Sequence, residues 1–242
     1  MSTIFSVWKE SISADQNFGL LLIISWIVRI MRKESGRNIC YGVKMKINIE
    51  KAIESFRINF SLIKRDGAED LLKWIETETD FYTAPASAAY HLACGSGLLI
   101  HSLNVRNNLD MFNRRLNLGF KDETVSICGL LHDLTKVNFY SSIQKRRLNT
   151  ETNKWETYNG YAYADSFPFG HGEKSVWYIS RFMKLTDEEA LAVNWHMGGF
   201  DDRVKGGSRS FNDAIGKYPL VFWLHTADQK ASSIDELNWD KE

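Results

Sequence analysis

The spacing of apolar side chains predicts helices along much of the chain. Over residues 49–76 the apolar positions follow a helical rather than an alternating spacing, and Asp66-Gly67 interrupts them, so two helices are expected. The same spacing runs through residues 97–118. Residues 121–136 are strongly apolar and begin with acidic side chains, which the helix dipole favours at a helix start. We therefore predict a helix over each of these two segments.

The pattern changes over residues 137–165, which are rich in Tyr, Thr, Phe and Trp around a polar ETNK centre. Such a composition predicts a β-hairpin. Helical spacing resumes in GHGEKSVWYISRFMK, in TDEEALAVNWHMG with Thr186 or Asp187 as N-cap, and in YPLVFWLHTADQKASSIDEL. We expect the Gly- and Arg-containing segment GGFDDRVKGGSRSFND to be a loop. The predicted fold is all-α with one inserted hairpin.

Composition narrows the class of protein. The chain has 242 residues, of which 44% are hydrophobic and 25% charged, and this suits one globular domain with or without an appendage. Its 30 basic residues balance its 30 acidic ones, so net charge does not indicate a polyanion-binding protein. Three widely spaced cysteines without a CxxC pair argue against a disulfide framework and a thiolate zinc site. We expect a cytoplasmic protein.

The first 44 residues form an extension whose role the sequence leaves open. Residues 18–31, FGLLLIISWIVRIM, are the most apolar stretch, but they are short for a bilayer span, which needs about 20 residues. Three interpretations stay open for these residues. They are a helix, packed on the domain or free of it, or a membrane-associated segment, or they result from the choice of start site. Met45 opens MKINIEKAIESF, a natural start for the domain that we expect over residues 45–242.

The histidines predict a metal site. Each falls at a helix end, in a loop that enters a helix, or on an apolar helix face: His91, His101, His132, His171, His196 and His225. Imidazole and carboxylate ligands suit Mn, Mg, Fe, Co, Ni or Zn, whereas thiolates would favour softer metals. The expected site is therefore rich in nitrogen and oxygen ligands.

The segment GLLHDLTK, residues 129–136, places His132 and Asp133 against an apolar run, with Lys136 four positions after the histidine. Charged groups beside core residues need a partner that offsets their desolvation, and a metal ion is one such partner. Neighbours on a helix project about 100° apart, so both can reach one metal, or one can bridge two. Alternatively, the dipeptide is a chance pair at a helix end and Lys136 stabilises the helix dipole.

Other residues stand in a recognisable order around this pair. His101 precedes it in GSGLLIHSLNV, and Asp228 follows it in WLHTADQKAS, where an unpaired aspartate on an apolar helix would be costly. The order of His, then His-Asp with its lysine, then a distant Asp resembles the HD-domain metal-dependent phosphohydrolases over about residues 79–235. The resemblance implies an HD-domain helical bundle in which the hairpin of about 137–165 is an insertion.

The segments GHGEKS and NWHMGG resemble the extra histidine positions of binuclear members. The resemblance implies one metal held by His101, His132, Asp133 and Asp228, and a second, bridged by Asp133, held by His171 and His196. Met197 stands where some binuclear members carry another histidine, and Thr135 where the family motif commonly has glycine. One or two divalent metal ions are therefore expected.

Several histidines also fit roles other than metal binding. His171 and His196 could cap helices instead of binding metal. His91, in the segment YHLACGSGLLIH that resembles a family loop, either packs in that loop or contacts substrate phosphate. We expect His225, three residues before Asp228, in the core or behind the ligands.

The resemblance implies hydrolysis of a phosphoester or phosphoanhydride bond. Asp133 would orient or deprotonate the attacking water, and Lys136 would contact the substrate and offset charge in the transition state. Basic residues of the hairpin and of the Gly-rich segment suggest a nucleotide or a short oligonucleotide as substrate, although they also suit a solvated face. A phosphoester small molecule is the broader expectation, and we expect no membrane partner. The alternative is a non-catalytic HD-fold module that binds a nucleotide.

Overall fold

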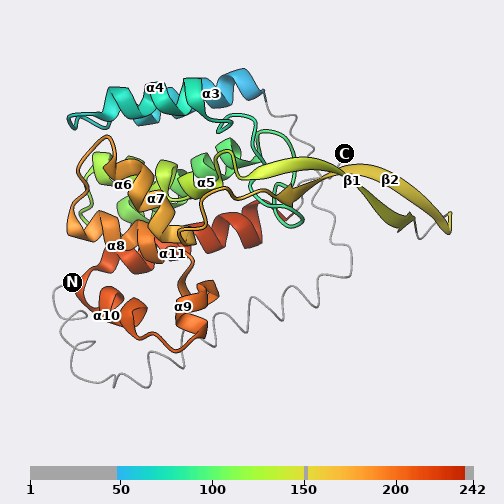
Figure 1. Ribbon diagram of the computed structural model, residues 1–242. Helices are drawn as coiled ribbons and strands as arrows, with labels where there is room; N and C mark the ends of the chain where they lie inside the picture. The colour runs from blue at the N-terminus through green and yellow to red at the C-terminus, as the bar shows by residue number, and fades with distance from the viewer. Residues whose placement is uncertain (1–47, 150–151, 238–242) are drawn as a thin grey trace. The chain divides into compact units, whose positions relative to one another are not determined.

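The helical prediction is confirmed in a computed structural model that describes residues 48–149 and 152–237 (Figure 1). The long helices are α3 (Ile49–Phe60), α4 (Ala68–Glu78), α5 (Gly97–Leu116), α6 (Asp122–Leu131), α7 (His171–Ser180), α8 (Asp187–Trp195), α10 (Ser210–Lys217) and α11 (Pro219–Lys230). Shorter helical segments are η1 (Leu134–Lys136), η2 (Gly198–Phe200), α9 (Asp202–Lys205) and the π-helical η3 (Ala231–Asp235). The apolar segment 18–31 and Met45 lie outside the described residues.

The core forms where α5 packs against α6 and α11, while α8 packs against α7 and α11. Its largest fully buried side chains include Leu98, Leu99 and Leu109 of α5 and Ile127 and Leu130 of α6. The α3 helix covers α5 and α6 on one side, with α4 beside it (Figure 1). No helix in the described part of the chain has the length and apolar character needed to cross a bilayer.

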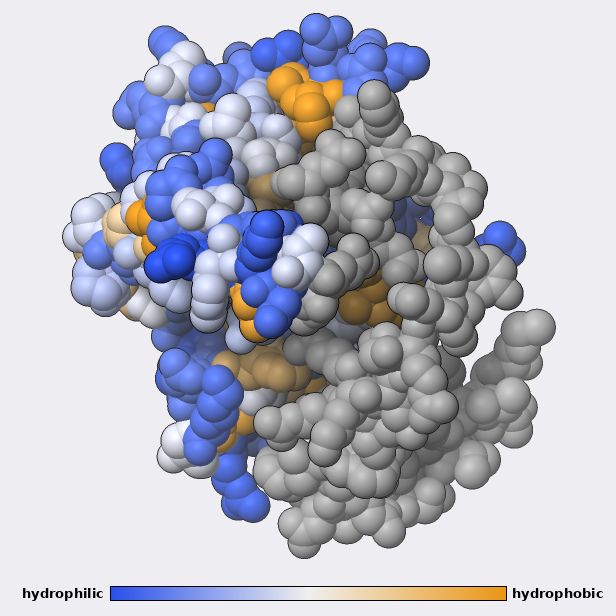
Figure 2. Space-filling model, turned by 90° about the vertical axis from the view of Figure 1, so that its right-hand side faces the viewer, coloured by the Kyte–Doolittle hydropathy of each residue, from blue (hydrophilic) through white to orange (hydrophobic). Residues whose placement is uncertain are grey.

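The predicted hairpin consists of β1 (Tyr140–Asn149) and β2 (Lys154–Tyr163), which pair antiparallel from Tyr140 opposite Tyr163 to Asn149 opposite Lys154. It projects away from the helices (Figure 1). The described surface on that side is largely hydrophilic, with separate hydrophobic spots (Figure 2). Most hairpin side chains are exposed, while Tyr140 and Lys145 of β1 and residues 160–162 of β2 are among those that are buried or partly buried.

Two details of the predicted secondary structure are wrong. The apolar helix predicted to reach residue 136 ends at Leu131, and Asp133 has a non-helical backbone (φ −106°, ψ 23°) before the short η1 turn. The Gly-rich segment predicted as a loop contains α9 and much of α10. Asp201 caps α9 through its side chain, and α10 buries Phe211 and Ala214, so local capping and burial outweigh the glycine content.

The start of α8 is fixed by a capping box, as the sequence predicted. Thr186 accepts a hydrogen bond from the Glu189 amide, and the Glu189 carboxylate accepts one from the Thr186 amide. The same carboxylate accepts hydrogen bonds from the Arg65 guanidinium, at 2.5 and 2.7 Å, and from the Thr124 hydroxyl. Glu189 thus joins the turn after α3 to α6 and α8.

Replacing this carboxylate should destabilise the fold. We expect Glu189→Ala to lower the free energy of unfolding by about 3 kcal/mol, because it removes the buried carboxylate that accepts hydrogen bonds from Arg65, Thr124 and the Thr186 amide. Urea unfolding of Glu189→Ala beside Asp187→Ala, a change at an exposed position of the same turn, measures the difference. Equal losses in the two variants would contradict the role of Glu189.

This contribution should depend on pH. Burial opposes ionisation of Glu189, but its hydrogen bonds from Arg65 and the Thr186 amide lower the pKa below that of an ordinary glutamate, about 4.3. The stabilisation is therefore present above the unfolded-state pKa and is lost as the pH falls through the lower folded-state pKa. The stability difference between the wild type and Glu189→Ala should shrink over that acidic range.

Candidate metal centre

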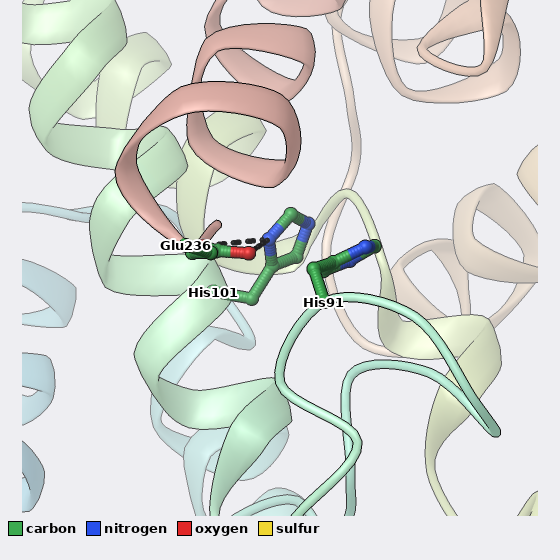
Figure 3. Close-up of side chains that lie close together, drawn as sticks. All are labelled: His91, His101 and Glu236. Atoms are coloured by element: carbon green, nitrogen blue, oxygen red, sulfur yellow. Dashed lines mark hydrogen bonds and ion pairs between the residues drawn. The ribbon is translucent and has the colours of Figure 1, made fainter. Parts of the chain in front are cut away.

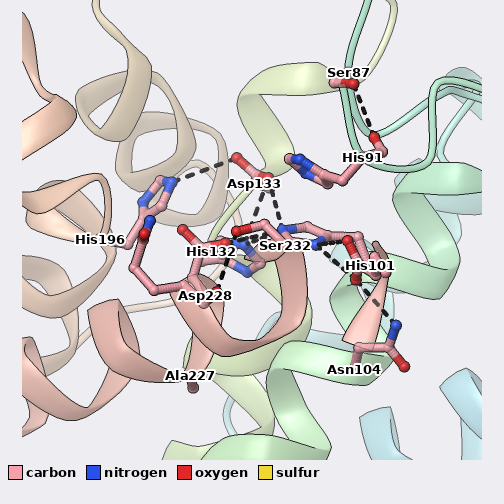
Figure 4. A network of polar contacts seen from close by, with 12 residues as sticks. Ser87, His91, His101, Asn104, His132, Asp133, His196, Ala227, Asp228 and Ser232 are labelled. Atoms are coloured by element: carbon pink, nitrogen blue, oxygen red, sulfur yellow. Dashed lines mark hydrogen bonds and ion pairs between the residues drawn. The ribbon is translucent and has the colours of Figure 1, made fainter. Parts of the chain in front are cut away.

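The six side chains predicted as metal ligands lie together, although they come from five segments of the chain. Figure 4 labels all of them except His171. They are His101 in the first turns of α5, His132 and Asp133 at the end of α6, His171 at the start of α7, His196 at the end of α8, and Asp228 in α11. Five of them are buried. His171, with 30% of its side chain exposed, lies nearest to solvent.

One half of the cluster is centred on the His101 ring. Its Nε2 atom lies 3.2 Å from Asp228 Oδ1 and 3.3 Å from His132 Nε2. Ligand atoms of these three residues all lie within 4.8 Å of one another. Nitrogen and oxygen atoms that converge in this way form a set that could hold a divalent cation.

Asp133 connects this half to the other. Its Oδ2 atom lies 3.4 Å from His101 Nε2 and 3.5 Å from His132 Nε2. Its Oδ1 atom lies 2.9 Å from His171 Nε2 and 3.4 Å from His196 Nε2. The two oxygens of one carboxylate therefore face two different pairs of histidines, which is the geometry that a bridging ligand requires.

The outer nitrogens of two rings are held by the backbone. His132 Nδ1 donates to the Gly129 carbonyl at 3.0 Å, and His196 Nδ1 donates to the Val193 carbonyl at 2.7 Å. Because a carbonyl only accepts, these bonds place the proton on Nδ1 and leave the Nε2 lone pair directed at the cluster. His196 Nε2 is buried without a hydrogen-bond partner among the described residues, and a cation would satisfy it. The donor set fits a metal.

The cluster keeps its carboxylates ionised. Burial would raise the pKa of Asp133, but Lys136 and the surrounding histidines hold it well below its usual range. Burial also opposes the charge of Asp228, whose pKa is nevertheless lowered by hydrogen bonding to His101 and by the positive charge of nearby histidines. Both ligand carboxylates are therefore negative at neutral pH, as cation binding requires.

Lys136 belongs to the same site, but not through the geometry that the sequence suggested. The helix ends before His132, so Lys136 does not continue a helical face four residues on. It lies at the end of the η1 turn, and its Nζ atom is 2.6 Å from Asp133 Oδ2. Burial would lower the pKa of Lys136, but the Asp133 charge raises it, so the ammonium stays protonated beside the cluster.

His91 lies beside the cluster in the loop that precedes α5 (Figures 3 and 4). Its ring centroid is 4.9 Å from that of His101, and its buried Nε2 atom has no hydrogen-bond partner among the described residues. Burial, together with the positive charges of His101 and Lys136, lowers the pKa of His91 to about 4. The ring is therefore neutral at pH 7 and offers an unpaired polar atom close to the site.

His225 lies behind the ligands, as expected from the sequence. Its Nδ1 atom donates to the His196 carbonyl at 2.7 Å. The ring also fills the space beside Gly198, where an added Cβ would come within 2.4 Å of it and where φ is 54°. His225 thus fixes the backbone that follows His196, and Gly198 is needed at that turn.

Glu236 is a member of the site that the sequence did not reveal. Both of its oxygens lie 3.1 Å from His101 Nδ1 (Figure 3). One of them also accepts a hydrogen bond from Asn104 at 3.0 Å. The residue is only 2% exposed. It follows η3, whose π-helical turn alters the spacing after Asp228, so no helical periodicity would have placed it near His101. An acidic residue soon after a candidate ligand was the only available signal.

Comparison with known proteins identifies the family. Residues 98–218, half of the chain, match the HD domain family, and this range includes His101, the His132-Asp133 pair, His171 and His196. No match was found among curated proteins or among solved structures. HD domains bind divalent metals, and the buried histidine and aspartate cluster suits that chemistry. The chain belongs to the HD-domain family, within the metal-dependent phosphohydrolase superfamily.

Proposed function

We propose that this protein is a metal-dependent phosphohydrolase that cleaves a phosphoester or phosphoanhydride bond of a nucleotide or a short oligonucleotide. The Asp133 carboxylate carries the proposal, because its two oxygens face separate histidine pairs at 2.9 to 3.5 Å. In this arrangement, His101, His132, Asp133 and Asp228 would hold one cation, and Asp133, His171 and His196 would hold a second. Mn, Mg, Fe, Co, Ni and Zn all suit these ligands.

A divalent cation held by these residues would supply Lewis-acid polarisation of a phosphoryl oxygen and would lower the pKa of the attacking water towards neutrality. Asp133 is ionised and central, so it can orient the attacking water or accept its proton. Lys136 keeps its positive charge where negative charge grows on the phosphoryl oxygens. His91 is neutral at pH 7, and its unpaired Nε2 atom can hydrogen-bond a phosphate oxygen.

Glu236 acts in this scheme as a positioning residue. A carboxylate on the outer nitrogen of a metal-binding histidine fixes the ring orientation and strengthens the inner nitrogen as a ligand. The 3.1 Å contacts of Glu236 with His101 Nδ1 have that geometry, and Asn104 holds the carboxylate in place. His101 is thereby held at its outer nitrogen while Nε2 faces the cluster.

Purified full-length protein, assayed with Mn²⁺ against a generic phosphodiester, a phosphomonoester and a panel of nucleotides, tests the function. Elemental analysis of the same preparation identifies any bound metal. Metal-dependent release of product from a nucleotide supports the proposal. Nucleotide binding without any metal-dependent release would instead favour the non-catalytic binding module.

Asp133 and Lys136 should respond differently to substitution. We expect Asp133→Ala to abolish metal binding and turnover together, since both halves of the cluster lose their shared ligand. Lys136→Ala should keep the metal content and lower kcat on the order of a hundredfold, because it removes one charge that stabilises the transition state. Metal content and initial rates are measured on the same samples.

Two further variants serve as controls for this comparison. Asp133→Asn keeps the side-chain volume and tests whether loss of metal follows from the missing charge rather than from a failed fold. Lys217→Ala removes an exposed lysine of α10 and should change neither quantity. Loss of metal in Lys136→Ala with metal retained in Asp133→Ala would contradict the assigned roles.

The positioning role of Glu236 predicts weaker metal binding. We expect Glu236→Ala to lower metal affinity about 10- to 100-fold, the usual effect of removing such a partner. Glu236→Gln retains an oxygen that can accept from His101 Nδ1 and should recover part of the loss. Competition with a chromogenic chelator measures the dissociation constant.

The neighbouring Asp235 provides the control. Its carboxylate contacts Lys230 and Asn108 rather than His101. Asp235→Asn should therefore leave metal affinity close to that of the wild type. If Asp235→Asn and Glu236→Ala weaken binding equally, the C-terminal segment has only a structural role.

A further inference from the structure

The hairpin has one face on which aromatic side chains gather. Side chains alternate between the two faces of a strand, and the register places Tyr140 opposite Tyr163 and Leu148 opposite Trp155. We call this side the aromatic face: Tyr140, Ser142, Gln144, Arg146 and Leu148 of β1, and Trp155, Thr157, Asn159, Tyr161 and Tyr163 of β2. It holds four of the five aromatic residues of the two strands and no acidic residue.

Cations accompany these rings. The Arg146 guanidinium lies 5.6 Å from the Trp155 ring centroid, and Trp155 and Tyr163 are 63% and 67% exposed. The two strands carry four basic residues and one acidic residue: Lys145, Arg146, Arg147 and Lys154 against Glu156. Of these, only Arg146 lies on the aromatic face, and the others lie on the opposite face of the hairpin. Exposed aromatic rings beside cations are what proteins use to stack bases and track a phosphate backbone.

The aromatic face begins shortly after the candidate metal centre along the chain. Tyr140 follows Lys136 by four residues and is partly buried at the base of the hairpin. Burial raises the pKa of the Tyr140 hydroxyl to about 12, and the charges of Lys136 and Asp133 also act on it. Its ring centroid lies 5.9 Å from that of Tyr163 and 6.4 Å from that of Tyr161.

The face then extends outward beyond the reach of a mononucleotide. From Tyr140 to Leu148, a strand rise of roughly 3.3 Å per residue gives a length of about 26 Å. The hairpin contacts the helical part of the chain midway along β1, where Lys145 Nζ donates to the Ala88 carbonyl of the loop that carries His91. An elongated aromatic surface with Arg146 beside Trp155, on a hairpin whose strands carry more basic than acidic residues, suits a flexible polyanion with exposed bases.

We propose that the substrate is a single-stranded oligonucleotide whose bases stack along the aromatic face of the hairpin while the bond to be cleaved lies at the metal centre. This inference rests on the proposed phosphohydrolase function and narrows its substrate. The aromatic face recognises the chemical features that single-stranded RNA and single-stranded DNA share. A duplex, whose bases are already stacked on each other, is a poor ligand for it.

The test compares substrates of different length on the metal-loaded full-length protein. Initial rates are measured with a small generic phosphodiester and with single strands of about six and about twelve nucleotides, as RNA and as DNA. We expect kcat/KM to rise with strand length. Trp155→Ala should raise KM for the longest strand about tenfold, the scale of one lost stacking contact, and leave the small phosphodiester unchanged.

The opposite face of the same hairpin supplies a matched control. There the Arg147 guanidinium lies 5.4 Å from the Tyr158 ring centroid, so the pair has the same chemistry but points the other way. Tyr158→Ala should leave KM for the long strand close to the wild-type value. Light scattering of the wild type and Trp155→Ala, without substrate, tests whether the face instead binds a second copy of the chain.

Three results would overturn the inference: a rate independent of strand length, equal effects of Trp155→Ala and Tyr158→Ala, or a dimer that Trp155→Ala dissociates. Each leaves the proposed function intact if the small phosphodiester is still cleaved. Absence of metal-dependent cleavage of every substrate would instead remove the proposed function itself.

Discussion

The buried carboxylate of Asp133 is the constraint around which the site is built. A carboxylate that is 2% exposed among apolar helices is costly unless its charge is compensated. The ammonium of Lys136 lies 2.6 Å from one oxygen, and histidines surround both oxygens. These partners come from α5, α7 and α8 as well as from the end of α6, so satisfying this one charge requires that the four helices converge.

The ends of α6 and α8 use the same local device. His132 and His196 each follow the last residue of a helix, and each ring donates through Nδ1 to the carbonyl three residues before it, that of Gly129 and that of Val193. Capping and metal binding are therefore compatible roles for one ring, since Nδ1 satisfies a helix carbonyl and Nε2 faces the cluster. The two roles predicted for His196, helix capping and metal binding, therefore use opposite sides of the same imidazole.

The C-terminal segment completes the site from outside the region that matches the family. Asp228 supplies an oxygen from α11, and Glu236 reaches back from the end of η3 to the outer nitrogen of His101. Asp235 and Lys230 bind Asn108, one turn further along α5 from Asn104. The first ligand helix is thus held along two turns by residues that follow it by more than a hundred positions.

The sequence determined the helical class, the hairpin, the capping box of α8 and the six residues of the candidate metal cluster, because spacing, turn composition and motif order are local properties of the chain. It placed the end of α6 wrongly and missed the helices after Gly199, where capping by Asp201 and burial of Phe211 decide the backbone. Only the tertiary structure revealed Glu236, the contact between Lys136 and Asp133, and the two-sided environment of that carboxylate. These depend on distances between side chains that are remote in sequence or separated by an irregular turn, and periodicity carries no information about such distances.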